Sequence, residues 1–194
     1  MEANNFAIAG VIVGWAIVSV AMFLGRRPSR GVRVRYVNVA GLVGLLLQGA
    51  GFALAFGWQR HRLGSSAFGW GVAMTSTVLA VGSAAFLLVA VRTLGKQWSL
   101  LPRLVEEHVL IQQGPYSVVR HPIYTAMLGM LLLTSFAFGL SSVVVVAAAS
   151  YIVGTILRIR MEERLLKQTF GEQYAVYSRR VPAFVPVRWR RKTP

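Results

Sequence analysis

The chain has 194 residues, of which 55% are hydrophobic, and its mean hydropathy is +0.57. So apolar a composition favours an integral membrane protein over a soluble domain. Cysteine is absent, which excludes disulfides, thiolate metal sites and a cysteine nucleophile. The net charge is +15, from 21 Lys and Arg against 6 Asp and Glu. Because the basic residues lie between apolar runs, they indicate cytoplasmic loops facing anionic lipid headgroups, not a nucleic-acid-binding surface.

Five apolar runs predict an all-α integral membrane protein with a single domain, residues 1–194. About 20 apolar residues are enough to cross a bilayer. The first run follows Met1–Asn5, which has a Glu, no basic residue and no cleavage site, so we interpret the run as a retained anchor. The last two runs are short and separated by a brief break, which predicts an antiparallel helical hairpin. The predicted spans are 6–24, 36–56, 68–91, 123–140 and 141–157.

The basic residues are distributed unevenly in this topology. All except Arg60 and Arg62 lie between the first and second runs, between the third and fourth, or after the fifth. Since Lys and Arg accumulate in cytoplasmic loops, we predict an N-terminus outside, a C-terminus in the cytoplasm, and a cytoplasmic catalytic region made of 92–122 and 158–187. The compact chain is typical of a prokaryotic inner-membrane protein.

Glycines are frequent in the second run, at Gly41, Gly44, Gly49 and Gly51. Small residues at such spacing permit helices to approach closely, although glycine is common in membrane helices generally. Further along, Gly171 is predicted to end a helix. The residues after it favour an amphipathic C-terminal helix at the membrane surface.

The segment from Glu106 to Tyr124, EEHVLIQQGPYSVVRHPIY, concentrates hydrogen-bonding side chains between apolar runs. Pro122 keeps the preceding residue extended and suits the first turn of a helix. Arg120 and His121 should therefore stand at the N-terminal end of the fourth span, where a helix favours an anion. With Tyr124 they offer donors for a carboxylate, such as the methionine carboxylate of a nucleotide-like cofactor. The same side chains also suit an anchor cluster at the lipid headgroups.

A second polar cluster, RIRMEE, runs from Arg158 to Glu163. Arg158 and Glu162 are four residues apart and share a helix face, while Glu163 is turned away by about 100°. An ordinary surface ion pair of this kind contributes only a few tenths of a kcal/mol. Its place at the exit of a membrane span favours a functional role, because charges there are costly.

The chemistry-bearing pieces occur in a defined order: HVLIQQGPYSVVRHPIY, a hydrophobic hairpin, then RIRMEERLLKQTFGEQYAVYSRRVPAF. In this order they resemble the isoprenylcysteine carboxyl methyltransferase family, and more broadly the membrane methyltransferases that include phospholipid methyltransferases. The resemblance covers roughly residues 94–186. It rests on His-x-Leu-x₃-Gly-x-Tyr, Arg-His-Pro-x-Tyr, Arg-x₃-Glu-Glu and Phe-Gly-x-x-Tyr-x-x-Tyr in combination.

The resemblance implies an S-adenosylmethionine-dependent enzyme with a cytoplasmic cofactor pocket and a lipid entrance between helices. Carried over residue by residue, it implies that the cofactor is held by His108, Val109, Leu110, Ile111, Tyr116, His121, Pro122, Ile123, Tyr124 and Glu162. Arg120 joins this predicted cofactor set as a donor. Arg158 and Glu162 are the predicted catalytic residues, with Arg158 on the substrate side. The family's prenylcysteine enzymes carry a Gln seven residues before the first histidine, where this chain has Leu101, so the adenosine-side contact should differ.

Methyl transfer from a sulfonium mainly requires approach and orientation. It needs neither a metal nor a covalent intermediate, so we predict no metal site. For a carboxylate acceptor Arg158 would orient the nucleophile, whereas an amine or thiol would require a base. Carboxyl methylation of a lipophilic substrate is thus favoured over N-methylation of a phospholipid or S-methylation of a thiol. A membrane NADPH-dependent reductase and a basic scaffold that binds anionic lipid are further alternatives. The sequence leaves the oligomeric state open.

Overall fold

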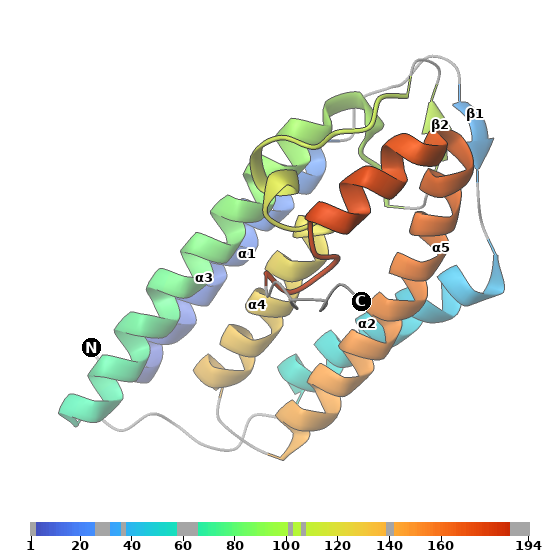
Figure 1. Cartoon of the computed structure of the whole chain (residues 1–194). Coiled ribbons are helices and arrows are strands. Elements are labelled where there is room, and N and C mark those ends of the chain that lie inside the picture. Colours follow the sequence, from blue (N-terminus) through green and yellow to red (C-terminus); the bar gives the residue numbers. More distant parts are fainter. Residues whose placement is uncertain are drawn as a thin grey trace, which may run out of the picture.

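The computed structural model describes residues 3–25, 32–35, 38–57, 66–100, 103–105, 108–138 and 142–186. Five α-helices make up most of it (Figure 1): α1 (Ala3–Gly25), α2 (Val39–Gly57), α3 (Ala67–Leu94), α4 (Pro122–Phe138) and α5 (Val143–Arg180). Two 3₁₀ turns, η1 (Gly95–Gln97) and η2 (Gly114–Ser117), and two short strands, β1 (Val32–Arg35) and β2 (Arg103–Val105), complete it.

Helices form at all five predicted spans, and four of them, α1, α2, α3 and α5, are long and apolar enough to cross a membrane. The protein is therefore an integral membrane protein. The fourth predicted span corresponds to α4, a shorter apolar helix of 17 residues. The five helices confirm the all-α prediction in its main feature, and β1 and β2 add a short antiparallel ribbon to them.

The helix that contains the fifth predicted span extends well beyond it. Instead of ending at residue 157, the helix continues through the whole RIRMEE cluster as α5, of 38 residues. Its only non-helical residue is Gly171, at φ 48°, which bends the chain there. Glycine tolerates this positive φ without the steric cost that other residues have. The predicted helix end at Gly171 is thus a kink between two helical stretches, the second of which is the predicted C-terminal helix.

Two helix pairs, α1 with α3 and α2 with α5, form the two sides of the molecule, and α4 contacts both (Figure 1). The larger hydrophobic core lies among α1, α3 and α4, and a smaller one lies among α2, α4 and α5. Alanines and glycines dominate the faces that meet. Small residues let helices approach closely, and close van der Waals packing drives helix association in a lipid environment.

Close approach of α2 and α5 depends on glycines of the predicted set. A Cβ on Gly44 would lie 2.7 Å from the carbonyl oxygen of Gly154, and one on Gly51 would lie 2.7 Å from that of Ala147. Backbone atoms at these positions cannot move aside as a flexible side chain can. The prediction of close packing is confirmed for Gly44 and Gly51 but not for Gly49, where a Cβ would meet nothing within 4 Å.

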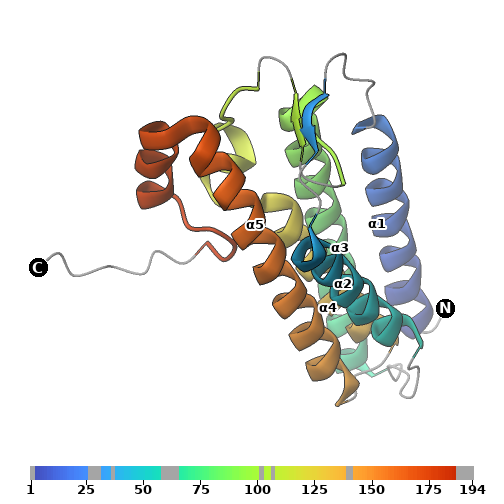
Figure 2. The same cartoon turned by 90° about the vertical axis from the view of Figure 1, so that its right-hand side faces the viewer.

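The predicted hairpin of α4 and α5 has the expected connectivity but is splayed. The two helices run antiparallel, yet α5 packs mainly on α2 and α4 mainly on α3. They separate toward the end of the molecule where β1 and β2 lie (Figure 1). Figure 2 shows α1 and α5 on opposite sides of the molecule. The space at the wide end of the splayed pair is where the functional site forms.

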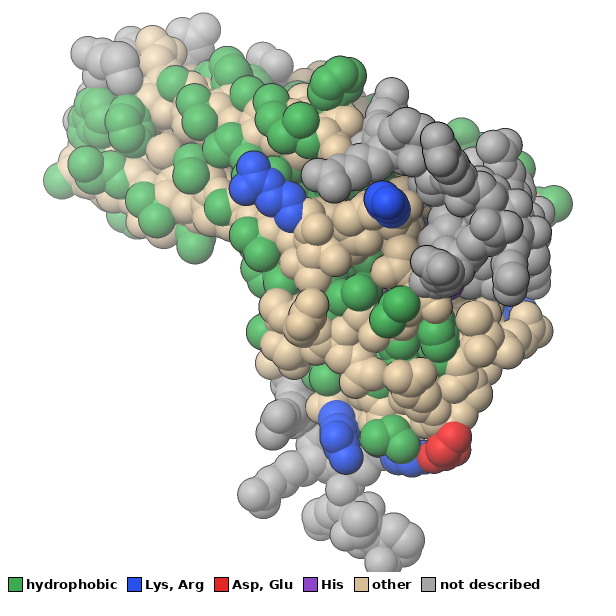
Figure 3. Space-filling view, turned by 90° about the horizontal axis from the view of Figure 1, so that it is seen from above, with side chains coloured by type: hydrophobic (Ala, Val, Ile, Leu, Met, Phe, Trp, Pro, Cys, Tyr) green, Lys and Arg blue, Asp and Glu red, His purple; other side chains and the backbone are tan. Residues whose placement is uncertain are grey.

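The polar segments gather at this same end. It receives η1, η2, residues 108–121 and the C-terminal half of α5 (Figure 1). Figure 3 shows the end from above, where Lys and Arg side chains stand out at several places and acidic ones at a single edge. The described segments predicted to share one side of the membrane therefore do share one end of the protein. Which side that end faces stays a prediction.

Candidate functional site

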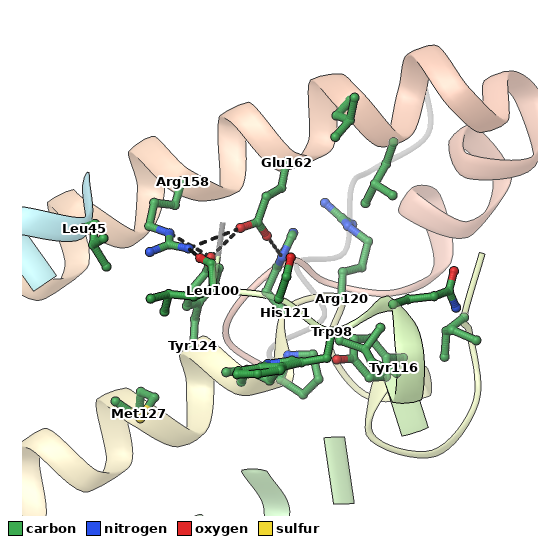
Figure 4. Close-up of a pocket in the computed structure, with 18 of the residues that line it drawn as sticks. Leu45, Trp98, Leu100, Tyr116, Arg120, His121, Tyr124, Met127, Arg158 and Glu162 are labelled. Carbon is green, nitrogen blue, oxygen red and sulfur yellow. Dashed lines mark hydrogen bonds and ion pairs between the residues drawn. The ribbon is translucent and has the colours of Figure 1, made fainter. Parts of the chain in front are cut away.

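A cavity of about 370 Å³ lies between α4 and α5, bounded by α2 and by the segment that carries η1 and η2 (Figure 4). Every site residue predicted from the sequence contributes to its wall. These are His108, Val109, Leu110, Ile111, Tyr116, Arg120, His121, Pro122, Ile123, Tyr124, Arg158 and Glu162. Two clusters separated by a whole helical hairpin in the sequence are thus joined in one pocket.

Tyr124 of α4 connects the two predicted catalytic residues of α5. Its hydroxyl donates a hydrogen bond to Glu162 and accepts one from Arg158 Nε at 2.9 Å. Arg158 and Glu162 also lie on the same helix face, 4.0 Å apart, as their spacing predicted. The Arg158 side chain is buried, and its Nη2 group donates to the carbonyl oxygen of Leu100. The pair is therefore an inward-facing part of the pocket and not a surface ion pair.

His121 lies between two carboxylates. Its Nδ1 is 3.4 Å from Glu162 Oε2, and its Nε2 is 3.5 Å from Glu163 Oε1. Arg120 pairs with the same Glu163 through Nε at 2.9 Å and through Nη2. Glu163, turned away from Glu162 on the helix, thus holds the Arg120–His121 turn. The cluster is a network of alternating charges, which lowers the cost of burying each of them.

The two histidines of the site respond oppositely to their surroundings. Burial alone would lower the pKa of His121, but the neighbouring Glu162 and Glu163 carboxylates outweigh it and raise that pKa above 6.5. Burial lowers the pKa of His108. Burial also raises the pKa of Tyr116 well above 10, with help from the charge of Glu162. The pocket thus favours a cationic His121 and a neutral His108.

Two backbone N–H groups just before α4 have acceptors within the chain. The backbone N–H groups of Arg120 and His121 donate to the carbonyl oxygens of Pro182 and Ala183, both at 2.9 Å. Residues 181–185, which we call the C-terminal strap, fold back to supply these acceptors. These two N–H groups are therefore not open to a ligand. That the helix start and the side chains of Arg120, His121 and Tyr124 bind a carboxylate stays a prediction. Pro122 does begin α4, as predicted.

The strap and the last stretch of α5 make further contacts with this turn. Arg120 Nη1 donates to the carbonyls of Ser178, at 2.9 Å, and of Val181. Thr125 Oγ1 donates to the carbonyl of Phe184, and Tyr177 donates to that of Tyr116 at 2.7 Å. The segment predicted as a membrane-surface helix is consequently a structural support for the pocket.

Sequence reasoning missed several pocket residues, among them Gln48, Gln97, Trp98 and Tyr174. Gln48 carried a signal, because a polar side chain inside a membrane span is usually functional. Gln97 accepts a hydrogen bond from the Val109 N–H at 2.8 Å. Leu101, which takes the place of the family's glutamine, lies outside the described residues.

Three buried polar atoms of the wall have no hydrogen-bond partner within the described part of the chain. They are His108 Nδ1, the Tyr174 hydroxyl and His121 Nε2, the last of which still lies 3.5 Å from the Glu163 carboxylate. Buried polar groups are normally satisfied, so unpaired ones that border a cavity indicate a ligand with polar groups of its own.

Comparisons with known proteins show which family and which proteins this chain is similar to. Residues 75–168, which include both polar clusters, match the model of the isoprenylcysteine carboxyl methyltransferase (ICMT) family. The chain is similar to protein-S-isoprenylcysteine O-methyltransferase B of Arabidopsis thaliana, with 35% identity over 101 residues, 50% of each chain. It is also similar to the cobalt-zinc-cadmium resistance protein CzcN of Cupriavidus metallidurans, with 37% identity over 100 residues, 50% of this chain and 45% of the relative.

The nickel-cobalt-cadmium resistance protein NccN of Alcaligenes xylosoxydans xylosoxydans is a further relative, 31% identical over 115 residues, 58% of this chain and 52% of its own. The chain spans about half the length of the curated relatives it matches. The matched stretch runs from the middle of α3 into α5 and holds most of the pocket wall. Through this stretch the chain is similar to the isoprenylcysteine carboxyl methyltransferase family.

Proposed function

We propose that the protein is an integral membrane methyltransferase that moves a methyl group from S-adenosylmethionine to a lipophilic acceptor. The observation that carries the proposal is the junction of Tyr124, Arg158 and Glu162 in one cavity. It joins the two family motifs around a space whose volume lies in the range of about 300–1,000 Å³ typical of ligand pockets.

The residues present suit the proposed cofactor. S-adenosylmethionine carries an ammonium, a sulfonium and a carboxylate, and the wall offers both an acidic group, Glu162, and basic ones, Arg120 and His121. Leu110, Ile111 and other apolar residues supply surface for the adenine ring. The unpaired His108 Nδ1 and Tyr174 hydroxyl add hydrogen-bonding capacity. We assign cofactor binding to this part of the pocket, with the Glu162 carboxylate facing the positively charged groups of the cofactor.

We assign the acceptor side to Arg158. A guanidinium has five N–H donors, and the described contacts of Arg158 use one on each nitrogen. One donor on each terminal nitrogen is left, which is the number needed to bind a carboxylate with two hydrogen bonds. When bound, S-adenosylmethionine would supply a methyl group whose bond to sulfur breaks as a bond to the acceptor oxygen forms, leaving a neutral thioether and a methyl ester. Arg158 would orient the nucleophile for this displacement.

The lipophilic character of the acceptor is inferred from the other walls of the cavity. On the α2 side they include Leu45, Gly49 and Phe52, and on α4 they include Met127. Gly49 lines the cavity and is exposed, so we infer that the cavity opens beside α2 toward the lipid. An acceptor with an apolar tail could enter there and present its polar end to Arg158.

Carboxyl methylation is favoured over the other acceptors because the acceptor side presents a cation. N-methylation of a phospholipid or S-methylation of a thiol needs a group that removes a proton, and Arg158 cannot do so. An NADPH-dependent reductase and a lipid-binding scaffold are less well supported, since neither accounts for the family match. Two relatives are named for metal resistance, but no three His, Asp or Glu side chains gather into a metal-binding group within the described ranges.

We also propose that the end carrying the site faces the cytoplasm of a prokaryotic cell and rests against anionic headgroups. Exposed basic side chains at this end include Lys96, Arg160, Arg164 and Lys167. Each basic residue near an anionic membrane surface contributes about 1 kcal/mol to its attraction. Replacing these four by Gln should weaken association of the detergent-solubilised protein with vesicles containing phosphatidylserine, but not with neutral vesicles.

Binding of the detergent-solubilised protein to S-adenosylhomocysteine and to NADPH tests the activity class. We expect a rise in melting temperature with S-adenosylhomocysteine alone, because a ligand that binds only the folded state stabilises it. Stabilisation by NADPH alone would exclude the methyltransferase. A subsequent screen of prenylated carboxylates, phospholipids and lipophilic thiols with a radiolabelled methyl donor would identify the acceptor class.

A further inference from the structure

Gln48 is a buried amide near the middle of α2, in a part of the chain that the family match does not reach. Its side chain lines the cavity, and the residue is only 7% exposed. Its neighbours along α2 are apolar: LVGLLLQGAGF surrounds it. Burying an amide costs free energy unless it is hydrogen-bonded, and polar residues inside membrane spans usually face a site or a partner.

The amide has two partners, both on α5. Gln48 Nε2 donates to Thr155 Oγ1 at 2.9 Å, and Gln48 Oε1 accepts from Arg158 Nη1 at 3.4 Å. The second contact fixes the orientation of the amide, because a guanidinium can only donate and must therefore face the oxygen. The Thr155 hydroxyl, which is fully buried, then receives the NH₂ group.

Adhesion between α2 and α5 does not explain this arrangement. The two helices are already in backbone contact at Gly44 and Gly154, and Ser150 Oγ donates to the carbonyl of Leu47 at 2.8 Å. These contacts lie outside the cavity wall. Gln48 is the α2 side chain whose hydrogen bond reaches the guanidinium of Arg158 among the contacts of the described residues.

Arg158 is thereby held on three sides. Tyr124 of α4 fixes Nε, the Leu100 carbonyl fixes Nη2, and Gln48 fixes Nη1. Losing the contact on Nη1 would free that end of the guanidinium, whose two terminal nitrogens must act together to bind a carboxylate.

We propose that Gln48 is a positioning residue for the acceptor side of the pocket, where its side-chain oxygen holds the Arg158 guanidinium in the orientation that receives the acceptor. The proposal rests on the function proposed above and assigns part of that function to an N-terminal helix. We assign donor binding to Glu162 and to residues 108–124, with which the described side-chain contacts of Gln48 form no hydrogen bond.

The test compares three variants. Gln48→Leu removes both hydrogen bonds with little change of volume, and Gln48→Glu restores an oxygen acceptor for Arg158. Ser150→Ala is the matched control. It removes the hydrogen bond from α5 to the carbonyl of Leu47, the residue before Gln48 on α2, and neither Ser150 nor Leu47 lines the cavity. For Gln48→Leu we expect kcat to fall about tenfold while the Kd for S-adenosylhomocysteine stays within about twofold. Gln48→Glu should recover most of the lost kcat, and Ser150→Ala should match the wild type in both measurements.

A readout independent of turnover is the side-chain NMR spectrum of protein labelled with ¹⁵N-arginine. The Arg158 Nε signal, assigned by its loss in Arg158→Lys, should shift or broaden in Gln48→Leu and not in Ser150→Ala. Unchanged Arg158 signals in Gln48→Leu, or a loss of kcat matched by Ser150→Ala, would overturn the positioning role. If the wild type transfers no methyl group, the proposed function fails, and the NMR comparison still decides whether Gln48 orients Arg158.

Discussion

The hydroxyl of Tyr124 donates a hydrogen bond to the carboxylate of Glu162 and so joins the start of α4 to the middle of α5. The two helices diverge at this level, and long polar side chains bridge the gap that apolar packing leaves open. The bridge keeps a carboxylate at the edge of the cavity, where only 22% of the Glu162 side chain is exposed. Its geometry makes Glu162 the residue on which donor binding should depend most.

Glu162→Gln should weaken binding of S-adenosylhomocysteine by about tenfold or more, because it removes the negative charge to which we assign the positive part of the ligand. Isothermal titration in detergent measures the effect, and expression should stay normal. Glu163→Gln is the matched control, since Glu163 pairs with Arg120 but does not line the cavity. We expect it to lower the melting temperature while affinity changes by less than about threefold. Equal losses of affinity in both variants would contradict the assignment.

Arg158→Ala should spare donor binding and lower turnover by at least about tenfold, since we assign the guanidinium to the acceptor side. Arg158→Lys should lower turnover too, because an ammonium cannot reach Tyr124, Gln48 and the Leu100 carbonyl from one planar group. Steady-state kinetics with a fixed acceptor, combined with titration of S-adenosylhomocysteine, separates the two effects. A parallel loss of binding and turnover would place Arg158 on the donor side.

Gly44→Ala should destabilise the protein by about 1–3 kcal/mol, the usual range for overpacking a tight contact. The added methyl group would meet the Gly154 carbonyl of α5 and push the two helices apart. Gly49→Ala is the control on the same helix, where the new Cβ has open space. Melting temperatures in one detergent should show a clear drop for the first variant and little change for the second.

How far the sequence predicts the fold depends on the kind of signal. Apolar runs located all five helices, because span length is set by the bilayer and not by tertiary contacts. They could not show that α5 continues through RIRMEE, since a helix that leaves the apolar layer keeps no hydrophobic pattern to mark it. The β1–β2 pair was missed for a similar reason: a ribbon of three or four residues has too little pattern to be recognised.

The site was predicted from motif order, and its internal contacts were not. Spacing placed Arg158 and Glu162 on one helix face, but nothing local could show that Tyr124, on another helix, lies between them. Nor could the sequence show that the strap covers the start of α4, because that contact joins segments about 60 residues apart. Gln48 was overlooked inside an apolar run, although its polarity alone marked it as unusual.

The C-terminal strap should be required for a folded site. Truncation after Arg180 removes the carbonyls that accept from the N–H groups of Arg120 and His121, and leaving such groups unsatisfied costs about 1–3 kcal/mol each when they are buried. We expect a lower melting temperature and loss of S-adenosylhomocysteine binding. Truncation after Pro186 retains every strap contact that the structure describes and serves as the control. Full binding by the shorter variant would show that the strap does not support the pocket.

The two site histidines should make the stability of the fold depend on pH in opposite directions on either side of pH 6.5, their ordinary pKa. The folded state raises the pKa of His121, so its contribution is complete below pH 6.5 and is lost as the pH rises through the raised value. The folded state lowers the pKa of His108, so its contribution is complete above pH 6.5 and is lost as the pH falls through the lowered value. Melting temperatures of the wild type, His121→Gln and His108→Gln across this range measure both effects. Relative to the wild type, His121→Gln should flatten the decline on the alkaline side and His108→Gln the decline on the acidic side. If His121→Gln leaves the alkaline decline unchanged, the carboxylates of Glu162 and Glu163 do not hold a charged imidazole between them.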